Sequence, residues 1–201
     1  MNSGATAERV FGALKRRIMS HEFRPGDRLD PTLLAGELAS SVTPVRDALY
    51  RLTGEGLAET RMGSGFFLPA LDEPHLKDLY DWSAELIFLA IRSWPRAKVA
   101  IPVALLNGTV LIADRAAALF LAIGQLSTNG EHAQAIERLS AQLHAVRSVE
   151  FHVLDHLDEE FDAWVGAAAA GDRNTLRRLC SAYHRRRNRN AGEIVRAVYR
   201  A

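Results

Sequence analysis

Hydrophobic residues recur every three or four positions along most of the chain, a period that indicates amphipathic helices. In the first seventy residues this pattern predicts a helix over residues 9–20, a second over 31–38 and a third that starts at about Ser41 and ends at Gly54-Glu-Gly56. Two short strands, residues 57–61 and 66–68, are expected around the loop Met62-Gly-Ser-Gly65. Glycines in such a loop permit the tight turn of a hairpin. The segment therefore predicts a winged helix-turn-helix with a two-stranded wing.

The helix that begins at Ser41 most favours a DNA-binding function. Ser41 or Thr43 can accept hydrogen bonds from the free amides of the first turn, and Pro44 suits that turn because it lacks an N–H. The residues at core-facing spacing are Val45, Ala48, Leu49 and Leu52. The residues turned outward are Thr43, Arg46, Asp47, Tyr50 and Arg51. A solvated amphipathic helix has the same pattern, but if the helix enters a DNA groove, Arg46 is the best base or phosphate contact.

Residues 6–70 resemble the GntR-type winged helix domain. The similarity rests on the turn Pro25-Gly-Asp-Arg-Leu29, the segment Ser41-x-Thr-Pro-Val-Arg-x-Ala-Leu49 and the wing Gly63-x-Gly65. The chain departs from the family at Val42, where an arginine is usual, and at Leu33, where fatty-acid-responsive members carry another. The resemblance implies a DNA-binding surface, for which we expect contacts from Arg28, Ser41, Thr43, Arg46, Arg51, Arg61 and Gly63.

The segment Pro69-Ala-Leu-Asp72-Glu-Pro74 interrupts both the strand and the helix period and predicts a domain boundary near residue 71. Beyond it only the helical period continues. We expect helices near residues 75–94, 104–127, 130–146, 150–170 and 174–199. The predicted fold class is thus mostly α, with a DNA-binding winged helix in residues 1–70 and an all-α bundle of about six helices in residues 71–201.

The bundle is similar to the helical effector-binding and dimerisation domain called FCD, at Leu79-Tyr-Asp81, Ser127-x-Asn129 and Ala168-x-Ala170-Gly-Asp172. Metal-binding members of that domain use an Asp-x-x-x-His pair on one helix and two later histidines. The resemblance puts Ala117, Leu121, Phe161 and Tyr183 in these four positions. It therefore implies no metal of the family type and an apolar effector pocket at these four residues. A shift of one residue would bring in His184 without rebuilding the set.

The family's anion-pairing arginine, and the glutamate four residues after it, fall on Ser83 and Ile87, which again favours an apolar pocket. A rival metal site would use His152 and His156, spaced one helical turn apart, with His184 within reach. We favour a solvated polar face for this pair, because a third ligand is not assured. The acidic residues after His156 are expected to pair with the basic run of residues 184–189.

Composition limits the alternatives. The chain has 201 residues, 25 Lys and Arg, 24 Asp and Glu, and a formal net charge of +1, so DNA affinity must come from local grouping of basic residues and be modest and salt-sensitive. The grouping that we expect comprises Lys15, Arg16, Arg17, Arg46, Arg51 and Arg61. Cys180 is the only cysteine, which excludes an intrachain disulfide and, with no signal peptide, favours the cytoplasm. The apolar stretch 99–126 is broken by Asn107, Asp114 and Arg115, as in a core helix rather than a membrane span.

Enzyme signatures are missing: there is no phosphate loop followed by lysine, no Gly-x-Ser-x-Gly and no cysteine placed as a nucleophile. We expect no enzymatic activity and no cofactor. The function that fits is a homodimeric transcriptional regulator, with repression as the expected mode, that binds a pseudo-palindromic operator in double-stranded DNA and senses a small apolar effector. The alternative is a degenerate member of the family that acts as an accessory or heterodimer partner through protein contacts. Val42 and Leu33 motivate it, because both remove DNA-contacting charge.

Overall fold

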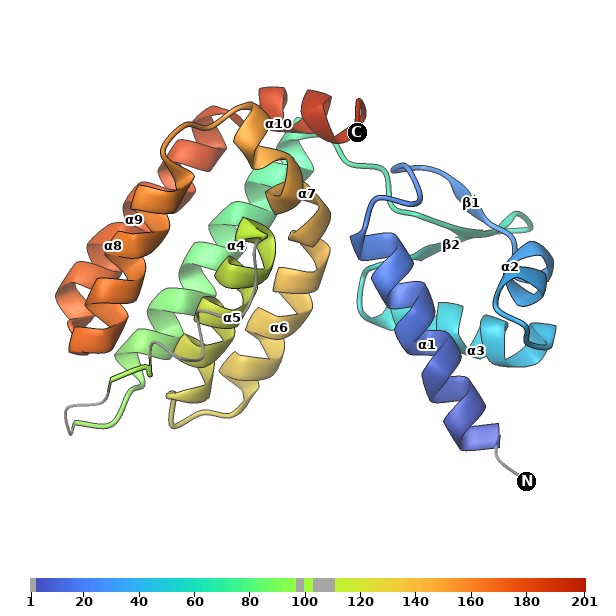
Figure 1. Ribbon diagram of the computed structural model, residues 1–201, viewed down its shortest axis with the longest axis horizontal. Coiled ribbons are helices and arrows are strands. Elements are labelled where there is room, and N and C mark those ends of the chain that lie inside the picture. Colours follow the sequence, from blue (N-terminus) through green and yellow to red (C-terminus); the bar gives the residue numbers. More distant parts are fainter. Residues whose placement is uncertain (1–2, 97–99, 103–110) are drawn as a thin grey trace. The chain divides into compact units, whose positions relative to one another are not determined.

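The computed structural model describes residues 3–96, 100–102 and 111–201 (Figure 1). The chain divides into two compact units, Met1–Leu71 and Asp72–Ala201. The first is a small α/β unit and the second is helical throughout its described residues. Over the described ranges, helices long and apolar enough to cross a bilayer are absent.

The first unit has the elements of a winged helix-turn-helix. Its helices are α1 (Ser3–Met19), α2 (Pro31–Glu37) and α3 (Val42–Gly54), and its strands are β1 (Arg28–Leu29), β2 (Glu59–Arg61) and β3 (Gly65–Phe67). The strands form one antiparallel sheet in the order β1-β3-β2. The predicted wing strands are therefore present. The third strand, β1, was not predicted, because two residues are too few to show an alternating pattern.

Apolar residues from all the helices of this unit meet in one core. Helices α1 and α2 both pack against α3. The most buried side chains, at 3% exposure or less, are Val10, Leu14, Leu29, Leu34, Val45, Ala48, Leu49, Leu52 and Ala58. The wing closes through Gly63 and Gly65, with φ of +69° and +93°, a backbone region that glycine adopts without strain. The core thus fixes α3, and the glycines let the wing turn beside it.

The second unit is a bundle built around α4 (Glu73–Arg92), which contacts α5, α6, α9 and α10 (Figure 1). The remaining helices are α5 (Ile112–Gln125), α6 (Glu131–Gln142), α7 (His144–Val149), α8 (Leu157–Ala170), α9 (Arg173–Arg189) and α10 (Ala191–Val198), with a 3₁₀ turn at Glu150–His152. Its core includes Leu76, Tyr80, Ile87, Phe120 and Trp164, each at most 1% exposed. Helices α5 and α6 approach closely at Gly124, where a Cβ would come within 2.9 Å of the Ala133 Cα.

The described part of this unit holds seven α-helices, where about six were expected. Two of the five predicted helical ranges are each divided into two helices. The segment 130–146 is interrupted at Leu143, and the last helix is interrupted at Asn190. There the Asn190 side-chain amide donates to the Arg186 carbonyl at 2.8 Å, the kind of local bond by which asparagine competes with helix continuation. The helix expected from Glu150 begins only at Leu157. The expected start at Ala104 lies outside the described residues.

Candidate functional site

The exposed N-terminus of α3 brings together three of the predicted DNA-contacting residues. Ser41 has extended backbone angles and precedes the helix, and its side chain makes no capping hydrogen bond. Ser41, Thr43 and Arg46 are all exposed. A helix N-terminus with uncapped amides favours an anionic group such as a DNA phosphate.

A surface hollow of about 280 Å³ adjoins this helix end. It is lined by Arg28, Leu29, Asp30, Pro31, Thr32, Val42, Arg46, Gly65 and Phe66. Arg28 and Arg46, which are 18 positions apart in the sequence, thus line the same hollow beside strand β3. Arg28 lies 4.0 Å from the Asp30 carboxylate, a loose contact, and Arg46 has no ion-pair partner in the described ranges. These two arginines can donate to an anionic ligand.

Arg51 lies on another face of α3. Its guanidinium is 2.9 Å from the Glu8 carboxylate and lies 3.8 Å from the centre of the Phe11 ring. Five helical positions after Arg46 correspond to about 140° around the helix, so Arg51 faces α1 rather than the hollow. The seven predicted residues therefore do not form one surface.

The wing contributes Arg61 and Gly63. Arg61 donates to Glu59 at 2.8 Å and lies over the Phe67 ring, so its charge is already compensated. Other basic residues of the predicted grouping are compensated as well, since Lys15 pairs with Glu55 at 2.7 Å and Arg17 with Glu22 and Glu37. Arg28 and Arg46 are left as the principal cations at the helix end.

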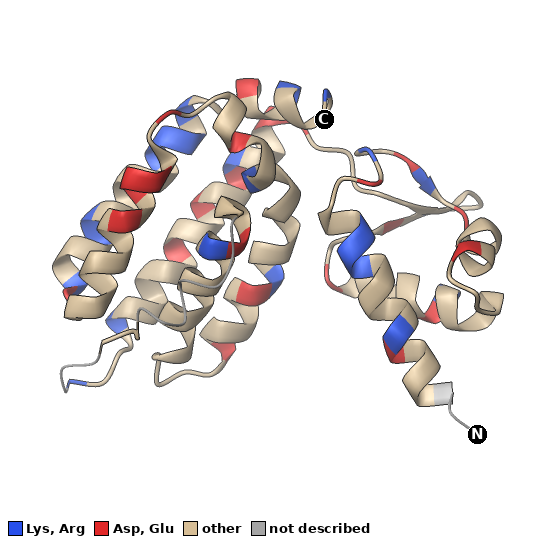
Figure 2. Ribbon diagram, viewed as in Figure 1, with Lys and Arg blue, Asp and Glu red and all other residues tan. Residues whose placement is uncertain are grey.

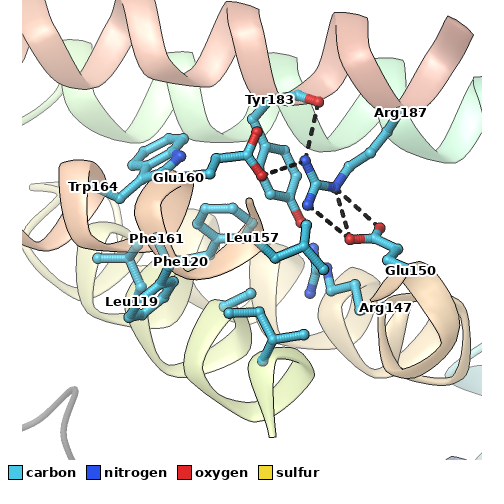
Figure 3. A pocket seen from close by; sticks show the side chains of 12 residues that line it. Leu119, Phe120, Arg147, Glu150, Leu157, Glu160, Phe161, Trp164, Tyr183 and Arg187 are labelled. Atoms are coloured by element: carbon cyan, nitrogen blue, oxygen red, sulfur yellow. Dashed lines mark hydrogen bonds and ion pairs between the residues drawn. The ribbon is translucent and has the colours of Figure 1, made fainter. Parts of the chain in front are cut away.

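The helical unit contains a small internal cavity (Figure 3). It is lined by Ile112, Ala116, Leu119, Phe120, Arg147, Glu150, Leu157, Glu160, Phe161, Trp164, Tyr183 and Arg187. Its volume of about 10 Å³ gives room for about one water molecule. Phe161 and Tyr183 line it, whereas Ala117 and Leu121 do not. From α5 the lining residues are Ile112, Ala116, Leu119 and Phe120.

The cavity wall includes charged residues, whereas the sequence predicted an apolar pocket. The Arg187 guanidinium donates from Nε and Nη2 to Glu150 at 2.7–3.0 Å and from Nη1 to Glu160 at 2.8 Å (Figure 3). Tyr80 also donates to Glu150, at 2.9 Å. Burial alone would lower the pKa of Arg187, but the carboxylates of Glu150 and Glu160 outweigh it and raise that pKa. Arg187 is therefore a fixed cation in the bundle.

Four buried donor atoms on three side chains around the cavity lack a protein partner in the described part of the chain. They are Nε and Nη1 of Arg147, Nε1 of Trp164 and the hydroxyl of Tyr183. All three side chains surround Phe120, with the Arg147 guanidinium 5.1 Å, and the Trp164 and Tyr183 rings 5.3 and 5.4 Å, from its ring centre. Burial raises the pKa of Tyr183, so its hydroxyl keeps its proton. Leaving such donors unpaired costs about 1–3 kcal/mol each.

His184 and Ser83 form a separate buried pair. The Ser83 hydroxyl lies 3.0 Å from Nε2 of His184, and Nδ1 is 2.8 Å from the Cys180 carbonyl. An Nδ1 proton donated to that carbonyl leaves Nε2 to accept from serine. Burial lowers the pKa of His184 to about 3 and raises the pKa of the adjacent Cys180 thiol to about 12. Both groups are therefore neutral at physiological pH, and Ile87 is buried beside them in α4.

The other histidines do not converge with His184. His152 and His156 are exposed, and His156 contacts Glu159 at 3.2 Å. Throughout the residues described, no three His, Cys, Asp or Glu side chains are grouped so as to hold a metal ion.

Figure 2 shows acidic residues on α8 and basic residues on α9. These helices are joined by Arg186 and Arg187 to Glu160. Asp158 and Asp162 pair with Arg115 of α5 instead. The basic run of α9 is thus partly engaged in contacts within the unit, as expected for an ion-pair face.

Comparison with known proteins assigns the first unit. Residues 6–68 match the sequence model described as bacterial regulatory proteins, gntR family. The Nta operon transcriptional regulator of Aminobacter aminovorans is 45% identical over 74 residues, which cover 37% of this chain and 35% of that protein. The chain matches only about a third of the length of such curated relatives.

Solved structures extend the likeness in fold to the second unit. A transcriptional regulator GntR from Rhodococcus sp. RHA1 has a TM-score of 0.70 at 18% identity, covering 93% of this chain and 97% of that one. McbR/YncC of E. coli has a TM-score of 0.65 at 19% identity, covering 96% and 99%. At such identities the likeness concerns the fold alone. In sequence it is the first unit, residues 6–68, that matches the gntR family of bacterial regulatory proteins.

Proposed function

We propose that this protein is a homodimeric transcriptional repressor that binds double-stranded DNA through α3 and the wing. The observation that carries the proposal is the exposed N-terminus of α3, with Ser41, Thr43 and Arg46. There Arg46 lines one hollow together with Arg28 and residues of the wing strand β3. The first turn of a recognition helix is the part that reaches base edges in the major groove. The match of this unit to a family of bacterial regulatory proteins supports the same function.

A dimer follows from the size of this surface. One recognition helix reads only a few base pairs, whereas two helices held about one turn of DNA apart read a pseudo-palindromic site. Arg28 and Arg46 supply few cations per chain, and a second copy doubles the phosphate contacts. Affinity then rises with the number of neutralised phosphates and falls steeply with salt.

The second part of the proposal is that the bundle responds to a small effector with hydrogen-bond acceptors, such as a carboxylate. Arg147, Trp164 and Tyr183 present unpaired donors to one cavity, and an acceptor group would satisfy them. This replaces the apolar effector expected from the sequence. A cavity of about 10 Å³ is too small for such a molecule, so binding requires a more open arrangement of the helices. The effector would thus shift the population between two arrangements of the bundle.

DNA binding is tested by fluorescence anisotropy with the DNA upstream of the protein's own gene, a scrambled competitor and a salt series. Arg46→Ala should weaken specific binding at least tenfold, which corresponds to the lower part of the about 1–3 kcal/mol expected for a good base contact. Arg51→Ala is the matched control, because it removes an arginine from the same helix on another face, and should change affinity by less than about threefold. Equal losses in both variants, or no binding at low salt, would contradict the proposal and favour an accessory protein that acts through protein contacts.

Effector binding is tested separately by thermal unfolding with a panel of small mono- and dicarboxylates. A ligand that binds the folded bundle raises its Tm in a concentration-dependent way. The same ligand should leave the Tm of Arg147→Leu unchanged. Stabilisation that persists in Arg147→Leu would place the ligand outside the cavity.

A further inference from the structure

Val42 is an exposed apolar side chain in the most polar part of the candidate interface. It is the first residue of α3, keeps 37% of its surface exposed, and is flanked by exposed Ser41 and Thr43. It lines the same hollow as Arg28 and Arg46. Val42 and Arg46 are four positions apart and so share one face of the helix. When the first turn of α3 approaches base edges, Val42 approaches them too.

Valine can read only one kind of base-edge group. It has no hydrogen-bond donor or acceptor, and the major-groove edges of guanine, adenine and cytosine present only such polar groups. Thymine alone adds an apolar group, the C5-methyl. We propose that Val42 contacts a thymine methyl group in the major groove and makes the preferred DNA site depend on an A·T pair at that position. This inference rests on the proposed function, because it requires α3 to lie in the groove.

The neighbouring residues give this contact a defined place in the site. Arg46, one helical turn further, carries guanidinium donors for a guanine edge or a phosphate. Ser41 and the first-turn amides suit a phosphate at the helix end. One face of α3 would therefore read a methyl group and an acceptor at nearby base pairs. Val42 is in this interpretation a specificity-determining residue, whereas the cations supply most of the affinity.

The experiment selects binding sites for the full-length protein from a random double-stranded DNA library. Each thymine of the selected site is then replaced by deoxyuridine, which removes the C5-methyl alone. One thymine per half-site should show about fourfold weaker binding on replacement, equal to about 0.8 kcal/mol for one buried methyl-sized group. Val42→Ala should bind the thymine and deoxyuridine sites equally.

Leu33→Ala is the matched control. Leu33 is also an exposed apolar residue, at 68%, but it lies on α2 and is not one of the residues that line the hollow. Its variant should still discriminate between thymine and deoxyuridine about fourfold, as the unchanged protein does. A second selection with Val42→Arg should replace the A·T pair by G·C, because arginine pairs with guanine.

The outcomes separate this inference from the proposed function. Specific binding that no deoxyuridine substitution weakens, or discrimination that survives in Val42→Ala, overturns the role of Val42 and leaves the DNA-binding function intact. Absence of specific binding to any selected DNA overturns both.

Discussion

Each unit of the chain contains one ion pair that shows the contrast between an exposed and a buried pair. In the winged helix unit the Arg51–Glu8 pair has side chains that are 50% and 67% exposed. In the helical unit the Arg187–Glu150 pair has side chains that are 2% and 1% exposed. Exposed pairs contribute little to stability and exchange partners at low cost, which suits a surface that binds a polyanion. A buried pair is strongly destabilising to break, because either partner alone is an uncompensated charge.

The buried network also joins elements that are far apart in sequence. Glu150 lies in the 3₁₀ turn before α8, Arg187 in α9 and Tyr80 in α4. A rearrangement of the side chains that line the cavity would therefore alter contacts in all of these elements. The winged helix unit has no comparable network among its described residues, because its core side chains are apolar. The comparison therefore separates a buried ion-pair network that is costly to disrupt from surface pairs whose members can exchange partners at low cost.

Arg187→Met gives the largest expected effect. It should reduce the free energy of unfolding of the helical unit by about 3–5 kcal/mol, since Glu150 would stay buried without its counter-ion. All three tryptophans lie in this unit, so their fluorescence in a guanidinium titration reports its unfolding. Arg196→Met, which removes an arginine 60% exposed in the same unit, should change the result by less than about 0.5 kcal/mol. Similar small losses in both variants would break the comparison.

Arg147→Met should have the opposite effect and stabilise the helical unit. Arg147 is as buried as Arg187, but its Nε and Nη1 lack partners, so replacing it by an apolar side chain of similar length should raise the free energy of unfolding by about 1–3 kcal/mol. The same fluorescence titration measures it, and an unchanged m-value would show that the unfolded state is comparable. Destabilisation as large as that of Arg187→Met would contradict the assignment of Arg147 as an unpaired donor.

His184 predicts how the helical unit depends on pH. Its pKa in the folded state is about 3, below the ordinary value of about 6.5, so the unfolded chain takes up a proton first as the pH falls. The stability due to neutral His184 is thus fully present above about pH 6.5 and is lost toward pH 3. Between pH 7.5 and 5.5 the loss should be about 1.4 kcal/mol.

Urea titrations at the two pH values measure this loss. His184→Gln should lose about 1.4 kcal/mol less than the unchanged protein over that interval, because glutamine does not titrate. His156→Gln, at an exposed position, is the control and should keep the full pH dependence. Equal pH dependence in the unchanged protein and His184→Gln would show that His184 is not held neutral by burial.

Arg51→Ala gives the smallest expected effect. The exposed Arg51–Glu8 pair and the contact with Phe11 should together contribute about 0.2–1 kcal/mol. Hydrogen exchange of amides in α1 and α3 of the full chain measures this local stability. The part due to the ion pair should disappear in 1 M salt. A loss above about 2 kcal/mol would remove the contrast between the two units.

The sequence predicted buried positions best where the buried residues are apolar. In α3 the predicted core residues Val45, Ala48, Leu49 and Leu52 are all at most 2% exposed. Their spacing placed Arg46 outward, because a helix has fixed angular geometry. The same geometry gave the helices of the second unit to within a few residues at most ends. It did not reveal the breaks at Leu143 and Asn190, where local bonds and packing end a periodic segment.

The sequence was least informative where charged residues are buried. Arg187 follows Leu176, Cys180 and His184 at a spacing of three to four residues along the buried face of α9. That spacing was the one sign in the sequence that Arg187 is buried. It was hidden within a basic run that resembles a solvated face. Arg51 was predicted to point outward from α3. The sequence did not show that an outward position on α3 can have an acidic partner on α1.

The sequence by itself determined the winged helix-turn-helix, the helical second unit and the exposed N-terminus of α3, because hydrophobic period and turn residues act locally. Only the tertiary structure decided which arginines pair closely with carboxylates and which do not. Arg28 and Arg46 meet at one hollow, Arg51 turns to Glu8, Arg187 joins Glu150 and Arg147 stays unpaired. Such pairings depend on distances between side chains remote in sequence, which no local pattern encodes.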